Sequence, residues 1–403
     1  MKYAAMIFTL PVFPSHTNLL ESWYNYTRMI FCKHETDSPD TGVGLSVLLC
    51  RGSLYFHALT HCPAPPPYWI ASMNRILLMA CLLLAFPVSW VAAQKVVITD
   101  PTKGGVDFGI QGEYSGDLGK GDEKEKFGIQ VIAQGKSKFR VVGYHGGLPG
   151  DGWNGEEPVR VEGEFSLNSD GTLSMKDKHG TGTIKDGVLI CDLGEDGEID
   201  GRLKRVVRES PTLGKKPPKD AVVLYSGPQD VEKWKGGKAD ENSLLMQGVT
   251  SKDTFGSHHL HVEFRIPFMP EARGQGRGNS GCYVQGRYEV QMLDSFGLEG
   301  KMNECGGVYS VSGVETNMCF PPLSWQTYDI DYTAAEYDGD KLIKNPSMTV
   351  RHNGVVIHEN LELPGERNTT AAPLKAGPAP GPVFLQNHGN PVRYRNVWVQ
   401  KKD

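Results

Sequence analysis

Short runs of alternating apolar and polar residues, separated by turns, fill the chain after about residue 100. Two of them read FGIQVIAQGKSKFRVVGYHGG and VRVEGEFSLNSDGTLSMKD. Alternation with a period of two is typical of antiparallel strands that bury one face, and pairs such as Asp170-Gly171 mark turns. No long stretch has the period of a helix. With 48 Gly and 26 Pro, the pattern predicts an all-β protein.

The run RESPTLGKKPPKD interrupts these strands and reads as a linker over about residues 209–220. We expect a small antiparallel β domain at 94–208 before it. After it, at 221–403, the strands recur through AVVLYSG, HHLHVEFRIP, GCYVQG, RYEVQMLD, QTYDIDYT, SMTVRHNGVVIHE, GPVFLQNHG and VRYRNVWVQ. Asn353-Gly354 is the strongest hairpin signal. The length and turn spacing predict a two-sheet jelly-roll sandwich.

Three strands of the second domain show one apolar and one polar row. In HHLHVEFRIP, His259, His261, Glu263 and Arg265 alternate with apolar residues. YEVQMLDS and GPVFLQNHG repeat the pattern, with Glu289 and Gln291 in the first and Phe384, Gln386 and His388 in the second. We expect the three rows to form one face, since a sandwich buries only one face of each sheet. Carboxylates, amides and imidazoles with little Lys suit a polyhydroxylated ligand. A solvated face with ordinary cross-strand pairs is the alternative.

The N-terminal part predicts export. MNRILLMACLLLAFPVSWVAAQ begins at Met73 and has the charged head, apolar stretch and small-residue exit of a signal peptide over 73–93. A lipoprotein signal would use Cys81. Residues 1–72 have no sustained period, and we interpret them as an over-long gene prediction or a disordered extension. The mature protein would then be secreted or periplasmic, without a membrane span.

Composition excludes several classes of function. The net charge is -5 and the charges form no long runs, so the sequence has no basic patch of the kind that binds nucleic acid. It also lacks the Gly-rich phosphate loop that would indicate a nucleotide cofactor. Four cysteines follow the signal segment, at positions 191, 282, 305 and 319. Of the three possible pairings, we favour a disulfide between Cys305 and Cys319.

The second domain resembles a known family. The segments LYSG, HVEFRIP, GNSGCYVQGRYEVQMLDS, WQTYDIDY, VRHNGVVIHE and GPVFLQNHGNPVRYRNVWV follow one another in order. They are similar to the 3-keto-disaccharide hydrolase family over about residues 221–400. The resemblance implies a concanavalin-like jelly roll and cleavage of 3-keto-glycosides. It also implies that a separate oxidoreductase supplies the 3-keto sugar, because the chain carries no redox domain.

The chemistry of such a cleavage sets the residues to look for. A ketone at carbon 3 acidifies the hydrogen on carbon 2, so a base can remove it, and the enolate expels the group on carbon 1 before water adds back. We expect the acid and base among Glu263, Glu289 and His388. A divalent metal could act as Lewis acid, with His259 and His261 as ligands. Substrate contacts are expected from Arg265, Asn279, Ser280, Gln291, Asp294, Gln386 and Asn390.

Two other functions fit the same polar face. A retaining glucanase would pair Glu289 with Asp294, but these residues lie on opposite sides of an unbulged strand, while that chemistry needs carboxyl groups about 5–5.5 Å apart. A lectin-like module would bind sugar without acid–base groups. A carboxyl and an imidazole converging on the ligand would favour the enzyme.

Overall fold

The computed structural model describes residues 4–6, 30–32, 46–48, 56–58, 96–161, 163–194 and 196–402. The chain divides into two units, Met1–Ala92 and Ala93–Asp403. The first holds a four-stranded sheet of order β1-β4-β2-β3. Its strands are β1 (Ala4–Met6), β2 (Ile30–Cys32), β3 (Ser46–Leu48) and β4 (Phe56–Ala58). The predicted signal peptide at 73–93 and most of 1–72 lie outside the described residues.

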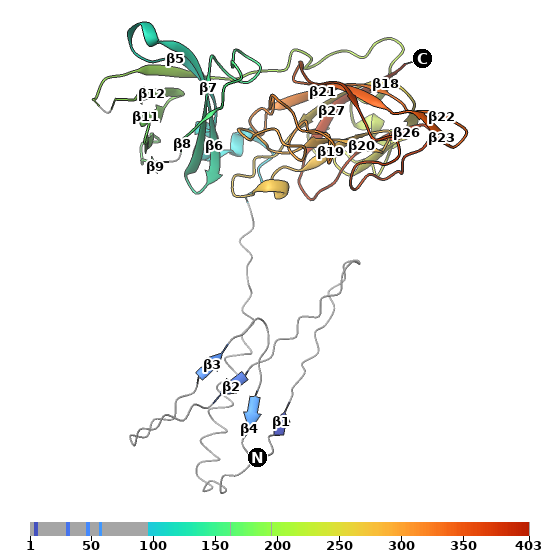
Figure 1. Ribbon diagram of the computed structural model, residues 1–403, viewed down its shortest axis with the longest axis horizontal. Coiled ribbons are helices and arrows are strands. Elements are labelled where there is room, and N and C mark those ends of the chain that lie inside the picture. Colours follow the sequence, from blue (N-terminus) through green and yellow to red (C-terminus); the bar gives the residue numbers. More distant parts are fainter. Residues whose placement is uncertain are drawn as a thin grey trace. The chain divides into compact units, whose positions relative to one another are not determined.

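The second unit begins with a nine-stranded antiparallel sheet (Figure 1). Consecutive strands pair from β5 to β8 and from β9 to β13, and β13 pairs back with β5. The two edges, β8 and β9, are joined by only residues 162–163, and β7 also approaches β9. The sheet is therefore an up-and-down barrel with one open seam. Its strands are β5 (Gly112–Leu118), β6 (Glu125–Gly135), β7 (Lys138–His145), β8 (Val159–Val161), β9 (Glu164–Leu167), β10 (Leu173–Asp177), β11 (Gly180–Lys185), β12 (Val188–Asp192) and β13 (Gly201–Val206).

Three short helices accompany the barrel. They are η1 (Pro101–Lys103), α2 (Gly105–Ile110) and η2 (Gly121–Glu123). Tyr114, Val131 and Leu173 are buried in the barrel core. The core also includes Phe268 and Leu323, which follow β18 and precede β21 of the second domain. The barrel and the sandwich thus share apolar contacts.

Two antiparallel sheets form the C-terminal sandwich, which confirms the predicted fold class. The seven-stranded sheet has the order β14-β27-β18-β21-β24-β25, with β16 beside β27, and the five-stranded sheet has the order β15-β17-β26-β19-β20. Leu260, Val262 and Phe264 of one sheet meet Val290 and Leu385 of the other in a single core.

The strands of the larger sheet are β14 (Val222–Tyr225), β16 (Leu245–Met246), β18 (His258–Arg265), β21 (Trp325–Thr333), β24 (Ser347–His352), β25 (Val355–Glu362) and β27 (Arg393–Lys401). Those of the smaller are β15 (Trp234–Lys235), β17 (Val249–Phe255), β19 (Ser280–Val284), β20 (Tyr288–Met292) and β26 (Gly381–Leu385). A hairpin of β22 (Glu336–Asp338) and β23 (Lys341–Lys344) and the helices η3 (Pro228–Lys233) and η4 (Gly274–Gly276) complete the domain. Asn353 and Gly354, at φ 50° and 82°, turn β24 into β25 as predicted.

The four cysteines of the second unit are buried free thiols, so the predicted Cys305–Cys319 disulfide is not formed. The Cys305 Sγ lies 3.2 Å from the Tyr328 hydroxyl. The Cys319 Sγ is 3.5 Å from the carbonyl oxygens of Leu293 and Phe320. Polar partners therefore satisfy both sulfur atoms without a covalent bond. Among the described residues, no helix has the length and apolar character needed to cross a membrane.

Candidate functional site

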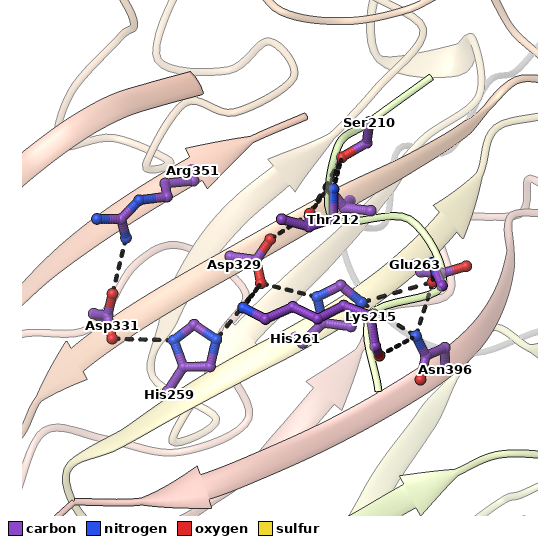
Figure 2. A network of polar contacts seen from close by, with 12 residues as sticks. Ser210, Thr212, Lys215, His259, His261, Glu263, Asp329, Asp331, Arg351 and Asn396 are labelled. Atoms are coloured by element: carbon purple, nitrogen blue, oxygen red, sulfur yellow. Dashed lines mark hydrogen bonds and ion pairs between the residues drawn. The ribbon is translucent and has the colours of Figure 1, made fainter. Parts of the chain in front are cut away.

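The polar row of β18 lies on the outer face of the seven-stranded sheet, where it forms an ionic network (Figure 2). Leu260, Val262 and Phe264 point into the core, so the alternate side chains point out. The His261 Nδ1 is 2.9 Å from the Asp329 Oδ1, and the His259 Nδ1 is 3.0 Å from the Asp331 Oδ1. Both aspartates lie on the neighbouring strand β21.

The segment between the two domains covers this network. β13 ends at Val206 and β14 begins at Val222. Between them, the Thr212 hydroxyl donates to the Asp329 Oδ2 at 2.7 Å and the Gly214 amide donates to the Glu263 Oε1 at 2.5 Å. The Asn396 side-chain amide donates to the Lys215 carbonyl at 3.0 Å. The Pro- and Lys-rich linker is thus a strap bound to the sheet, and we call residues 210–215 the strap.

Hydrogen bonding keeps the carboxylates of this network ionised. Burial alone would raise the pKa of Glu263, but hydrogen bonds from His261, Asn396, Arg395 and the Gly214 amide outweigh it and hold that pKa at about 2. Burial is likewise outweighed at Asp329, where hydrogen bonds from His259 and His261 lower the carboxyl pKa. A carboxylate with all its acceptor positions occupied is a poor general base, and one with so low a pKa is a poor general acid.

The prediction that three strands share one polar face is therefore wrong. β18 belongs to the seven-stranded sheet, whereas β20 and β26 belong to the five-stranded sheet. The apolar rows of β18, β20 and β26 all point into the same core. The polar row of β18 therefore faces away from those of β20 and β26. Glu263 and Arg265 thus do not join Glu289, and the Arg265 guanidinium lies over Trp325, 5.0 Å from the ring centroid.

The metal hypothesis for His259 and His261 does not fit their surroundings. Both imidazoles are paired with aspartates that also bind Thr212, Lys215, Arg351 or Lys402. Among the residues that the structure describes, no group of three or more His, Cys, Asp or Glu side chains is arranged to hold a metal ion.

A second polar face lies on the outside of the five-stranded sheet. Strands β26, β19 and β20 are neighbours there. The register places Tyr283 opposite both Glu289 and Phe384, and Gly281 opposite Gln291. Since Val290, Met292, Val284 and Leu385 belong to the core, their alternate neighbours form this face. We call it the Glu289 face.

Glu289 is 3% exposed and its carboxyl leans across the strand toward Gly281. A Cβ atom at position 281 would lie only 2.1 Å from the Glu289 Oε1, so glycine makes room for the carboxyl. Burial raises the pKa of Glu289 to about 7, and hydrogen bonding by Tyr283 opposes that rise only in part. A carboxyl that titrates near neutral pH can both accept and release a proton, which suits general acid–base catalysis.

Amide side chains lie on the same face as this carboxyl. The Gln386 Nε2 lies 3.2 Å from the Tyr283 hydroxyl, and the Gln291 Nε2 lies 3.2 Å from the Gln275 Oε1. The Asn279 Nδ2 donates to that same Gln275 oxygen at 3.0 Å, while the Asn279 Oδ1 is buried without a partner. The Asn390 Oδ1 accepts from the Asn279 backbone amide at 2.7 Å. Glu289, Gln291, Asn279, Gln386 and Asn390 were all predicted from sequence, and the structure brings them together.

Three predicted site residues lie elsewhere or apart. The Ser280 hydroxyl points into the core, 2.5 Å from the Tyr394 hydroxyl, because it alternates with Asn279 and Gly281. Asp294 is buried in an ion pair with Arg277 at 2.6 Å, so it is not available as a partner of Glu289 in retaining hydrolysis. His388 is exposed in the loop that follows β26, between Gln386 and Asn390.

Three residues of this face were not predicted from the sequence, namely Gly281, Tyr283 and Gln275. The turn Gln285–Arg287 is the signal that could have found the first two, because it fixes the register of β19 on β20 and so sets Tyr283 beside Glu289. Gln275 lies in η4, outside any strand pattern. Tyr309 was missed as well, and its amide donates to the Glu289 carbonyl at 3.1 Å, which extends the sheet edge.

Comparisons with known proteins identify the C-terminal domain. Residues 220–400 match the 3-keto-alpha-glucoside-1,2-lyase-like domain. Three solved structures of proposed glycosyl hydrolases from Parabacteroides distasonis are also similar. One is 30% identical with a TM-score of 0.41, covering 46% of this chain and 85% of that one. Two are 17% identical, with TM-scores of 0.31 and 0.34, covering 45% and 49% of this chain and 99% of each of those. No curated protein matches.

The domain match indicates an enzyme of the carbohydrate hydrolase type. Through its C-terminal domain, the chain belongs to the 3-keto-alpha-glucoside-1,2-lyase-like family, as the motifs predicted.

Proposed function

We propose that the protein cleaves 3-keto-glycosides and that Glu289 is the base that removes the hydrogen on carbon 2. The observation that carries the proposal is the buried Glu289 carboxyl, whose pKa burial raises to about 7. Deprotonated Glu289 is a stronger base than an exposed glutamate, and it is still substantially ionised at neutral pH.

The steps follow from the chemistry of the ketone. Glu289 takes the carbon-2 proton, and the electron pair moves onto the carbonyl oxygen as an enolate. The enolate re-forms the ketone as a carbon–carbon double bond to carbon 1 develops and the bond from carbon 1 to the leaving oxygen breaks. The proton held on Glu289 is then available to the leaving oxygen, and water adds to carbon 1 of the enone. Side-chain amides donate well to an enolate oxygen, and Gln386 and Gln291 supply such groups on the Glu289 face.

Tyr283, whose hydroxyl donates to the Thr370 carbonyl at a long 3.3 Å, can turn that hydroxyl and act as a donor in this scheme. Burial and the neighbouring Glu289 raise the pKa of its hydroxyl, so the phenol keeps its proton. The ring also packs against Phe384, with centroids 5.2 Å apart, which holds the hydroxyl in place. The proposal further includes export directed by the signal peptide at 73–93, and an upstream oxidoreductase that makes the 3-keto substrate.

The test is release of 3-keto-glucose from a 3-keto-glucoside by the purified protein and by a Glu289→Gln variant. The matched control is Glu359→Gln, which changes an exposed carboxyl on β25. Turnover by the protein and the control, with none by Glu289→Gln, supports the proposal. Binding of unoxidised oligosaccharide without any turnover would favour a lectin-like module instead. A parallel assay with chelator tests for a divalent metal, and loss that added metal reverses would show that the reaction needs one.

A further inference from the structure

The barrel domain contains a partly open cavity of about 490 Å³. Its walls come from alternate residues of successive strands, as the inward-facing row of a barrel requires. They include Phe127 and Ile129 on β6, Val141 on β7, Met175 on β10 and Leu189 on β12. The volume lies within the range of about 300–1,000 Å³ found for small-molecule sites, which are mostly apolar with a few placed polar groups.

Polar groups are confined to one part of this lining. Glu125 and His145 pair there at 2.7 Å, and both side chains are partly exposed, 48% and 31%. Asp177 also lines the cavity, and its Oδ2 is buried without a hydrogen-bond partner, although its Oδ1 accepts from the His179 amide at 2.8 Å. A buried acceptor without a partner is costly unless a ligand supplies a donor.

The charges of the lining select among apolar ligands. Three carboxylates line the cavity, those of Glu123, Glu125 and Asp177, and no Lys or Arg does. A fatty-acid carboxylate or a sulfonate would meet these three carboxylates with no Lys or Arg to pair with. A hydroxyl or amine, by contrast, would satisfy the free oxygen of Asp177.

We propose that the barrel lumen binds an uncharged apolar molecule that carries a hydroxyl or amine donor, with its apolar body against Phe127 and Met175 and its donor at Asp177. This site lies in a different domain from the Glu289 face and does not depend on the function proposed for that face.

The experiment titrates the full-length protein with N-phenyl-1-naphthylamine, an uncharged amine whose fluorescence rises in apolar surroundings. The comparison probe is 1-anilinonaphthalene-8-sulfonate, which is similar in size but anionic. We expect saturable binding of the amine at one site per chain and at least tenfold weaker binding of the sulfonate. Equal affinity for the two probes would overturn the selection by charge.

Two kinds of variant locate the site. Met175→Trp and Leu189→Phe fill the lumen to different extents and should weaken amine binding at least tenfold. Ser174→Trp is the matched control, since Ser174 neighbours Met175 on β10 and faces the other way. Asp177→Lys should strengthen sulfonate binding at least tenfold. Thermal unfolding of each variant shows that it folds. No saturable binding by the unaltered protein, or unchanged binding in both filled variants, would overturn the proposal.

Discussion

The two outer faces of the sandwich carry the same sequence pattern and opposite chemistry. Glu263 and Glu289 each occupy a polar position between apolar residues, and each is almost completely buried, at 1% and 3% exposure. The Glu263 carboxylate is bound by Arg395, Asn396 and the strap, so its pKa falls to about 2. Glu289 has only Tyr283 to oppose burial, and its pKa rises to about 7. Burial alone therefore does not mark a reactive carboxyl, and the number of donors that reach it decides.

The sharpest test of this comparison measures the activity of a variant at each of the two glutamates. Glu289→Gln removes the proposed base, and we expect kcat to fall by about 10²–10⁴-fold. Glu263→Gln should leave kcat within a few fold wherever the variant is folded, because its face points away from Glu289. Steady-state kinetics on a 3-keto-glucoside measure both, and a larger loss in Glu263→Gln would reverse the assignment.

Glu263→Gln should lower the stability of the fold, although it leaves the activity nearly unchanged. Glu263→Gln removes the charge that His261 and the half-exposed Arg395 bind, and losing hydrogen bonds to a charged group typically costs about 1.5–3 kcal/mol of unfolding free energy. The folded-state pKa of Glu263 lies below its ordinary value of 4.5, so the stability it contributes is present above pH 4.5 and is lost as pH falls through about 2. Urea unfolding at neutral pH and at pH 3 measures both effects. Equal stability of variant and parent would mean that the network contributes little.

Gly281→Ala sharpens the comparison without changing any charge. The added methyl group would overlap the Glu289 carboxyl and displace it. Misplacing a catalytic group by about 1 Å can cost up to about 10²-fold in rate, so we expect a loss of about ten- to a hundredfold in kcat. Gly256→Ala is the control, because a Cβ there meets no atom within 4 Å. Equal rates for both variants would argue against a role for the carboxyl position.

The smallest effect concerns pH. If Glu289 is the base, kcat/KM should rise with pH and level off above about 7. Tyr283 lowers the pKa of Glu289, so Tyr283→Phe should move this limb to higher pH. Because burial raises the folded-state pKa of Glu289, its effect on stability depends on pH in the opposite sense to that of Glu263. The stability that Glu289 contributes is present below its ordinary pKa of 4.5 and is lost as pH rises through about 7. A limb that moves to lower pH in Tyr283→Phe would contradict this account.

Strand parity gave much of the Glu289 face from sequence, since Glu289 and Gln291 must share a side of one strand. Parity could not tell which sheet a strand joins, because that depends on long-range pairing. The row with Glu263 was therefore assigned to the wrong face. The partners of the two glutamates were also beyond the pattern, since Gly281 and Tyr283 depend on register, and the Gly214 amide belongs to a segment without periodicity.

The strap has a consequence for how the chain resists cleavage. Exposed polar segments are common sites of proteolytic nicking, and a protease must draw the chain into its cleft in an extended form. Here the Lys215 carbonyl is held by Asn396, the Gly214 amide by Glu263 and the Ser210 hydroxyl lies 2.6 Å from that of Thr327. Trypsin would have to detach the strap before it could cut after Lys215, so cleavage at that position should be slow for as long as the ionic network stays intact.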